Sequence, residues 1–147
     1  MILWRISRYE DLKGIGGHRA SARWHRAGHP VVYLAETPAS ALLEACVHTS
    51  ANDVPPSYTL LRVEGPDALE ISSVAYADLP EDWIDRIEVT QEIGTAWLHR
   101  RESVLLRIPS AIVPQTFNLL FNPVHDQASA FSITASFTYP FDARLKQ

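Results

Sequence analysis

Short apolar runs separated by turn-forming residues predict strands along most of the chain. The runs are rich in β-branched and aromatic residues, which fit the pleated, half-buried surface of a sheet. Their ends are marked by Gly65-Pro66, Pro109 and Asn122-Pro123, which favour turns or end a strand. Strands are predicted at residues 2–7, 31–35, 58–64, 68–72, 103–108, 117–121 and 131–139.

Helix signals occur in three places between these strands. Thr37 is a good N-cap and Pro38 suits the first helical position, so a helix is predicted to start there and to run to about His48. Residues 80–86 predict a helical turn. Thr90 is predicted to cap a further helix that continues to about Arg101.

Residues 14–30 hold four of the six glycines in the chain, together with Pro30. This composition predicts a long and flexible loop, and long loops within a domain are often functional. Residues 52–57, with two consecutive prolines, predict a shorter linker.

The order of these elements predicts an α+β fold. Strands and helices do not alternate regularly, so a mainly antiparallel or split sheet with flanking helices is expected rather than a doubly wound one. The 147 residues, of which 46% are hydrophobic and 20% charged, suffice for one domain with its own core. No internal repeat or low-complexity segment divides the sequence, so one domain is predicted over residues 1–147.

Charge is distributed unevenly along the chain. Residues 1–30 carry six Lys or Arg against Glu10 and Asp11, the rest carries seven bases and fifteen acids, and the net charge is −4. An acidic protein is a poor partner for DNA or RNA, so direct nucleic-acid binding is not expected. A local basic patch fits a small phosphorylated ligand, although a merely solvated loop would have the same composition.

Composition also predicts where the protein works. No apolar run approaches the roughly 20 residues that span a bilayer, and charge interrupts the first residues too early for a signal peptide. The lone Cys46 excludes an internal disulfide and a cysteine-based zinc site. These features predict a soluble protein, without membrane contact, in a reducing cytoplasm.

The segment between Arg23 and Glu44 concentrates the candidate chemistry. Arg23 supplies a guanidinium that can grip a pyrophosphate, and Tyr33 supplies a ring that can stack on a flat cationic base. Glu44 supplies a carboxylate that can stabilise positive charge on a ribose. Together these groups indicate a nucleotide substrate, NAD in particular. Each also has a structural interpretation, namely surface charge, a core aromatic and the solvated stripe of an amphipathic helix.

Other familiar motifs are missing from the sequence. His25 and His29 are four residues apart, but Gly28 and Pro30 oppose a helix there, so no metal site is expected. Ser110 lacks the Gly-x-Ser-x-Gly setting of a serine hydrolase. The glycines at 14, 16 and 17 match neither a dinucleotide-binding pattern nor a P-loop.

A set of short motifs runs through the chain in a fixed order. They are Arg23-Trp24, Pro30-Val-Val-Tyr33-Leu-Ala-Glu36, Leu43-Glu44, Pro109-Ser110-Ala111 with Val113-Pro114, and Asn118-Leu-Leu-Phe-Asn122-Pro123-Val-His125. In this order they resemble the RES domain family, which is named for its Arg, Glu and Ser positions. The resemblance extends over nearly the whole chain. His25 is a departure, because Asn often follows the Arg-Trp pair in that family.

The resemblance implies a fold related to ADP-ribosyltransferases and a toxin of a type II toxin–antitoxin pair that depletes NAD. It also implies an Xre-like helix-turn-helix antitoxin as partner, and a toxin dimer within the heteromeric complex. The expected catalytic residues are Arg23, Tyr33, Glu44 and Ser110. The expected contacts of NAD are Arg23, Tyr33, Glu44 and Asn118. NAD is the substrate, and neither a separate cofactor nor a metal is implied.

Three alternatives to NAD degradation stay open. The first is transfer of ADP-ribose to a cellular protein, which would use the same NAD site. The second is a ribonuclease that uses the His and Arg cluster at residues 18–29, although the pI of about 5.8 argues against it. The third is a module that binds NAD without turnover. For degradation itself, water and phosphate are both candidate acceptors.

Overall fold

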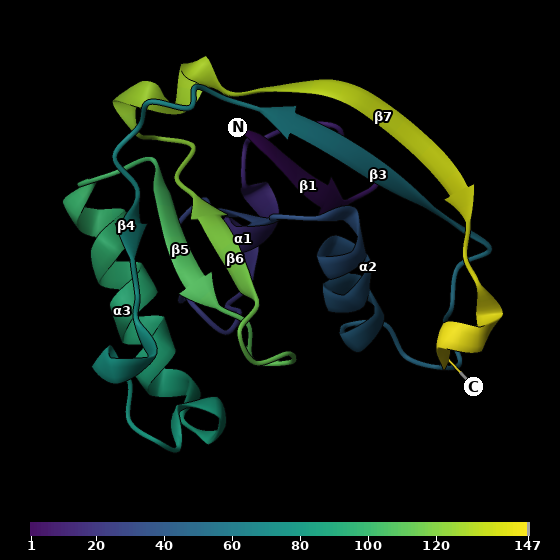
Figure 1. The fold of residues 1–147 in the computed structure, drawn as a ribbon, viewed down its shortest axis with the longest axis horizontal. Helices are drawn as coiled ribbons and strands as arrows, with labels where there is room; N and C mark the ends of the chain where they lie inside the picture. The colour runs from purple at the N-terminus through teal and green to yellow at the C-terminus, as the bar shows by residue number, and fades with distance from the viewer. Residues whose placement is uncertain (147) are drawn as a thin grey trace.

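Seven strands pair into one mixed sheet in the computed structural model, which describes residues 1–146. The order across the sheet is β4-β5-β6-β2-β1-β3-β7, and among these strands only β4 and β5 run parallel (Figure 1). The prediction of an α+β fold around a mainly antiparallel sheet is confirmed. The strands are β1 (Ile2–Ile6), β2 (Val32–Ala35), β3 (Ser57–Glu64), β4 (Ser72–Ser73), β5 (Leu105–Pro109), β6 (Phe117–Phe121) and β7 (Ser132–Pro140).

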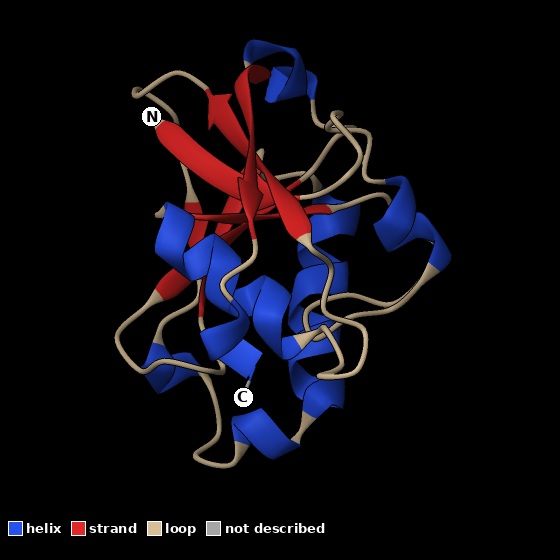
Figure 2. Cartoon of the chain, turned by 90° about the vertical axis from the view of Figure 1, so that its right-hand side faces the viewer, coloured by secondary structure: helices blue, strands red, loops and turns tan. Residues whose placement is uncertain are grey.

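Helical segments connect these strands, and most of them lie on one side of the sheet (Figure 2). The α-helices of the described chain are α1 (Ile15–Arg19), α2 (Pro38–Val47) and α3 (Ile87–Arg100). The shorter 3-10 turns are η1 (Tyr76–Asp78), η2 (Trp83–Asp85), η3 (Asp126–Ala130) and η4 (Ala143–Lys146). None of the helices within residues 1–146 has the length and apolar character needed to cross a membrane.

Helix α2 begins as the sequence predicts. Thr37 Oγ1 accepts a hydrogen bond from Ser40 N at 3.0 Å, and Pro38 occupies the first turn, where its missing N–H leaves no helical bond unmade. Ala41 packs with Ala35 of β2 and Leu60 of β3. This packing holds α2 against the middle of the sheet.

The two faces of the sheet carry separate apolar clusters. On one face, Trp97 of α3 packs in the same cluster as Leu120. On the other face, Leu119 packs in the same cluster as Phe131. Tyr33 packs against the first cluster, as the two-residue alternation of a strand requires. The face that carries Trp97, called the α3 face below, is the one from which the candidate site is built.

Three predictions of local structure are wrong. Residues 68–72 do not form a strand, and only two residues pair as β4. Thr90 does not cap α3, because the helix already begins at Ile87 and the Thr90 hydroxyl is engaged by a distant part of the chain. The glycine-rich segment 14–30 is not irregular throughout, because α1 forms within it.

Candidate active site

A hydrogen-bonded group of three side chains lies at the centre of the site. Asn118 Nδ2 donates to Glu44 Oε1 at 2.8 Å, and Ser110 Oγ donates to the same oxygen at 3.2 Å. Asn118 on β6 is opposite Ile108 on β5, so Asn118 and Ser110 project from the same face. Glu44 reaches them from α2 as a half-buried carboxylate. The interpretation of Glu44 as a solvated helix residue therefore fails.

Ser110 has all of its hydrogen-bonding capacity in use. Its Oγ accepts from the backbone N–H groups of Ile112 at 3.1 Å and Val113 at 3.3 Å, while its own proton goes to Glu44. Ser110 N also donates to Thr116 O at 2.8 Å, which closes the loop of residues 110–116. Because a hydroxyl has one proton and two lone pairs, Ser110 can orient Glu44 but has no capacity left for a ligand in this arrangement.

Two acceptor atoms of the group stay without a partner. Glu44 Oε2 accepts no hydrogen bond from the described residues, and Asn118 Oδ1 is buried without one. Asn118 is only 8% exposed, and a buried acceptor left unpaired costs about 1 to 3 kcal/mol. Such atoms are candidates for contact with donors of a ligand. The site thus contains a carboxylate with one oxygen fixed and one free.

Helix α3 holds the backbone of the segment that carries Arg23. The Thr90 hydroxyl donates to Arg23 O. Gly94 lies directly beneath the segment, since a Cβ added there would be 1.7 Å from Trp24 O. Only glycine allows this approach of helix and segment. The backbone at Arg23 is therefore fixed by a helix that starts more than sixty residues later.

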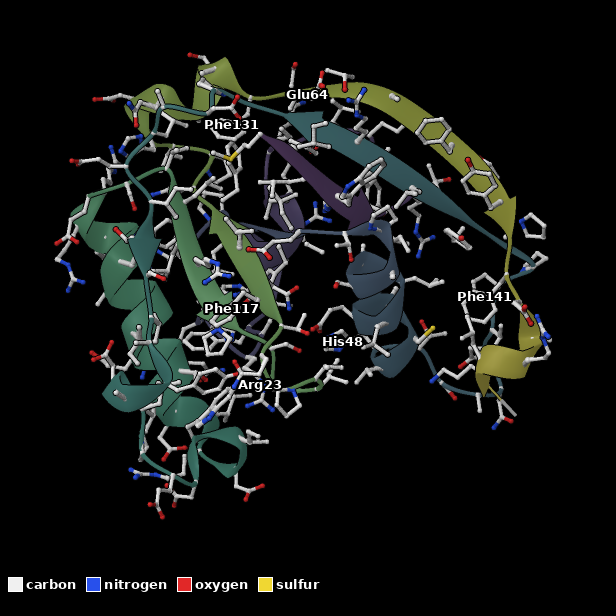
Figure 3. The ribbon with its side chains drawn as sticks, viewed as in Figure 1. Arg23, His48, Glu64, Phe117, Phe131 and Phe141 are labelled. Carbon is white, nitrogen blue, oxygen red and sulfur yellow. The ribbon has the colours of Figure 1, made fainter. Side chains whose placement is uncertain are left out.

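The Arg23 side chain extends from this fixed backbone near enough to Tyr33 for its charge to act on the Tyr33 hydroxyl. Its Nη1 donates to Ile84 O at 2.9 Å, and a guanidinium has four further N–H groups with which to bind an anion. In Figure 3, Arg23 is seen toward the same edge of the molecule as Phe117, the first residue of β6, and His48, which follows α2. This position suits a residue that binds the pyrophosphate of an extended ligand.

Tyr33 is fixed by its hydroxyl within the same segment. The hydroxyl oxygen accepts from Trp24 N at 3.1 Å and lies 2.8 Å from His25 Nδ1. Burial raises the pKa of the Tyr33 hydroxyl above its usual range, and the nearby Arg23 charge opposes this only in part. Tyr33 is therefore a neutral phenol and not a base. Its ring is half-buried, so part of it remains accessible.

The register of β2 and β6 places Tyr33 beside the Glu44 group. Ala35 is opposite Asn118 and Tyr33 is opposite Leu120. Tyr33 and Asn118 are therefore diagonal neighbours on the α3 face, about 7 to 8 Å apart. The structure thus brings the five residues singled out in the sequence to one region. Glu44, Ser110 and Asn118 form the hydrogen-bonded group, Tyr33 is next to Asn118, and Arg23 is near Tyr33.

Sequence reasoning missed the residues that support Arg23 and Tyr33. Thr90, Gly94 and Thr95 are all buried on one side of α3, and Thr95 Oγ1 accepts from Arg26 N at 3.0 Å. The available signal was the spacing of Thr90 and Gly94 at i and i+4, which places these two small residues on one helix face. His25, 1% exposed, gave no such signal because it lies in a loop.

The assembled groups define what the site can do chemically. A guanidinium can bind a phosphate, an aromatic ring can stack on a flat cation, and a fixed carboxylate can stabilise positive charge. Within residues 1–146, no group of three or more His, Cys, Asp or Glu is arranged to hold a metal ion.

Comparisons with known proteins find relatives that match nearly the whole chain. The model of the RES domain matches residues 2–142. A protein of Pseudomonas putida named Toxin Res is 46% identical over 147 residues, covering 99% of both chains. The Prs ADP-ribosylating toxin of a Sphingobium species is 32% identical over 154 residues, covering 97% of this chain and 94% of that one. Among solved structures, the M. tuberculosis MbcT-MbcA toxin-antitoxin complex contains a chain with a TM-score of 0.73 and 18% identity, covering 95% of this chain and 84% of that chain.

Proposed function

The chain belongs to the RES domain family, and on that premise we propose that it is an NAD-degrading toxin of a type II toxin–antitoxin pair. The reaction is cleavage of the bond between nicotinamide and ribose, with water or phosphate as the acceptor. One observation carries the proposal: Asn118 and Ser110 hold one oxygen of Glu44, while the other accepts no hydrogen bond from residues 1–146. Asn118, which holds this carboxylate, is a diagonal neighbour of the half-buried Tyr33 across β2 and β6.

The chemistry of NAD explains why such a carboxylate is useful. Nicotinamide leaves as a neutral molecule with the electron pair of the broken C–N bond, so no acid has to protonate it. Positive charge then develops on the ribose. Glu44 Oε2 would face this charge, while the bonds to Oε1 keep the carboxylate from rotating. Charge stabilisation by a pre-oriented group is typically worth about 3 to 4 kcal/mol.

The other two residues would bind the parts of NAD on either side of the reacting bond. Arg23 would hold the pyrophosphate through two parallel hydrogen bonds, which lysine cannot reproduce. Tyr33 would stack on the cationic nicotinamide ring and favour its charge in the bound substrate. Asn118 Oδ1 would accept a hydrogen bond from a donor of the ligand.

Transfer of ADP-ribose to a cellular protein is the second candidate function. It is supported by a relative, 32% identical to this chain, that is named Prs ADP-ribosylating toxin. Both reactions require the same NAD site and differ only in the acceptor that attacks the ribose.

A ribonuclease is disfavoured by the state of His25, the buried histidine of the cluster. His25 is buried, and both of its ring nitrogens have protein partners. It is therefore unavailable for proton transfer to RNA. Intact cellular RNA together with a falling NAD level after induction would support the proposal, and degraded RNA with unchanged NAD would contradict it.

The decisive experiment is NAD consumption by the purified protein, with and without phosphate. Glu44→Gln should lower the rate roughly a hundredfold or more, whereas Glu81→Gln, at an exposed loop position, should leave it unchanged. Radiolabelled NAD then separates the acceptors: label in ADP-ribose indicates water, label in its phosphorylated form indicates phosphate, and label on protein indicates transfer. NAD that stays intact with the wild-type protein would refute the proposal.

The proposal extends to a partner that silences the toxin. We propose an Xre-like helix-turn-helix antitoxin that blocks the site, in a complex built around a toxin dimer. Co-expression of the small protein encoded immediately upstream should restore the NAD level and co-purify with the toxin. Absence of such a gene, or full NAD consumption by the co-purified complex, would contradict this part.

A further inference from the structure

His25 connects three parts of the loop around the site. It is 1% exposed. Its Nδ1 lies 2.8 Å from the Tyr33 hydroxyl, and its Nε2 lies 2.8 Å from Gly17 O and 2.9 Å from Ala20 O. The imidazole therefore links Gly17 within α1, Ala20 just after α1, and Tyr33 in β2.

The partners of His25 determine which ring nitrogen carries the proton. Gly17 O and Ala20 O can only accept hydrogen bonds, so Nε2 must be protonated to bond with either. Tyr33 has a single proton, and its oxygen already accepts from Trp24 N at 3.1 Å. The Tyr33 proton therefore goes to His25 Nδ1, which must be unprotonated. This is the only assignment in which every atom of the chain of bonds has a partner.

A second proton on the ring would break this chain of bonds. With Nδ1 protonated, Tyr33 Oη would have to accept from both His25 and Trp24. Its own proton would then have no acceptor among the described residues. A buried donor without a partner is unfavourable, so the ring orientation of Tyr33 depends on neutral His25. Burial also raises the pKa of the Tyr33 hydroxyl, which keeps its proton available for this bond.

We infer that His25 is a positioning residue of the site, neutral with its proton on Nε2, which fixes the Tyr33 ring through Nδ1 and ties residues 17–20 to it through Nε2. The part of this inference that concerns NAD rests on the proposed function. The protonation state does not, and it can be measured without substrate.

The protonation state is tested by nitrogen NMR of the imidazole rings in the purified protein. We expect the His25 signals to show a protonated Nε2 and an unprotonated Nδ1 at neutral pH. An Nδ1-protonated ring or an imidazolium would overturn the inference. Assignment uses His25→Asn, which removes the signals. If the wild-type protein consumes no NAD, the proposed function fails, while this measurement still decides the state of His25.

Two substitutions separate the contact with Tyr33 from the contact with the loop. The Oδ1 of asparagine can take the place of Nδ1, so His25→Asn keeps an acceptor for Tyr33 and loses the bonds to Gly17 and Ala20. The amide of glutamine can take the place of Nε2, so His25→Gln keeps the loop bonds and loses the acceptor. We expect His25→Asn to lower the melting temperature with KM for NAD nearly unchanged. We expect His25→Gln to raise KM roughly threefold to tenfold, the effect of one lost hydrogen bond.

If His25 had only a structural role, the variant with the lower melting temperature would also have the higher KM. That result would overturn the inference. The pathway through Tyr33 is tested with Tyr33→Phe, which lacks the hydroxyl. His25→Gln should then add no further increase in KM to that of Tyr33→Phe, because both remove the same bond. Additive effects would contradict a role through Tyr33. His18→Gln, in the same loop but outside this chain of bonds, is the matched control and should behave as wild type.

Discussion

Gly94 offers the most direct test of how α3 holds the Arg23 segment. In Gly94→Ala, the new Cβ would lie 1.7 Å from Trp24 O, whereas ordinary contacts of a Cβ begin near 3.4 Å. Helix and segment would have to separate by about 1.7 Å, the difference between these two distances. The bonds that Thr90 and Thr95 make with the segment would be lost in that movement.

The expected loss of stability follows from three contributions. Overpacking costs about 1 to 3 kcal/mol, and two lost hydrogen bonds cost about 1 kcal/mol each. Alanine in a helix interior returns about 1 kcal/mol relative to glycine. The balance predicts that Gly94→Ala lowers the free energy of unfolding by about 2 to 4 kcal/mol, although helix propensity alone would predict stabilisation.

Urea unfolding measures this difference directly. With a typical slope for a domain of this size, the midpoint should fall on the order of 1 to 2 M urea, and KM for NAD should rise because Arg23 is displaced. Gly16→Ala is the matched control, because its Cβ would meet nothing within 4 Å, and it should unfold at the wild-type midpoint or slightly above. A Gly94→Ala protein that unfolds at or above the wild-type midpoint would refute the close packing of α3 on Trp24.

Three further outcomes are expected. Ser110→Ala removes the donor to Glu44 and both acceptor contacts of its loop, so the initial rate of NAD consumption should fall at least roughly tenfold. Asn118→Asp sets a second carboxylate against Glu44, and repulsion between the two charges raises the pKa at which the second of them ionises, so the acid limb of the pH–rate profile should move to higher pH. Burial, and then the neighbouring His99, lower the pKa of His29 below 6.5. The unfolded chain therefore binds more protons below pH 6.5, stability falls as the pH drops through that range, and His29→Gln should flatten this fall in urea titrations.

The sequence predicts correctly those helices and strands whose boundaries are set by contacts between residues a few positions apart. The Thr37 cap and Pro38 place the start of α2 correctly, because capping is a contact between residues three positions apart. The apolar run at 117–121 coincides with β6. These elements carry Glu44 and Asn118, so their local setting could be predicted from sequence, and the order of motifs indicated that they belong to one site.

Long-range contacts could not be predicted in the same way. Thr90 has the side chain of an N-cap, but its hydroxyl donates to Arg23 O, 67 residues away, and tertiary contact overrides the local preference. The two hydrogen bonds of Glu44 depend on the order in which β5, β6 and β2 pair, which no local pattern encodes. Without the strand order, Glu44 can equally be interpreted as a solvated residue on the surface of its helix.

The separation of the site along the chain has a consequence for synthesis on the ribosome. Glu44 is 66 residues from Ser110 and 74 residues from Asn118. A nascent chain that has exposed β1, β2 and α2 carries Arg23, Tyr33 and Glu44, but nothing yet orients the carboxylate. The orienting bonds form only after β5 and β6 have emerged and β6 has paired with β2. Fragments released before that point should not consume NAD, so activity is expected only from chains that extend through β6.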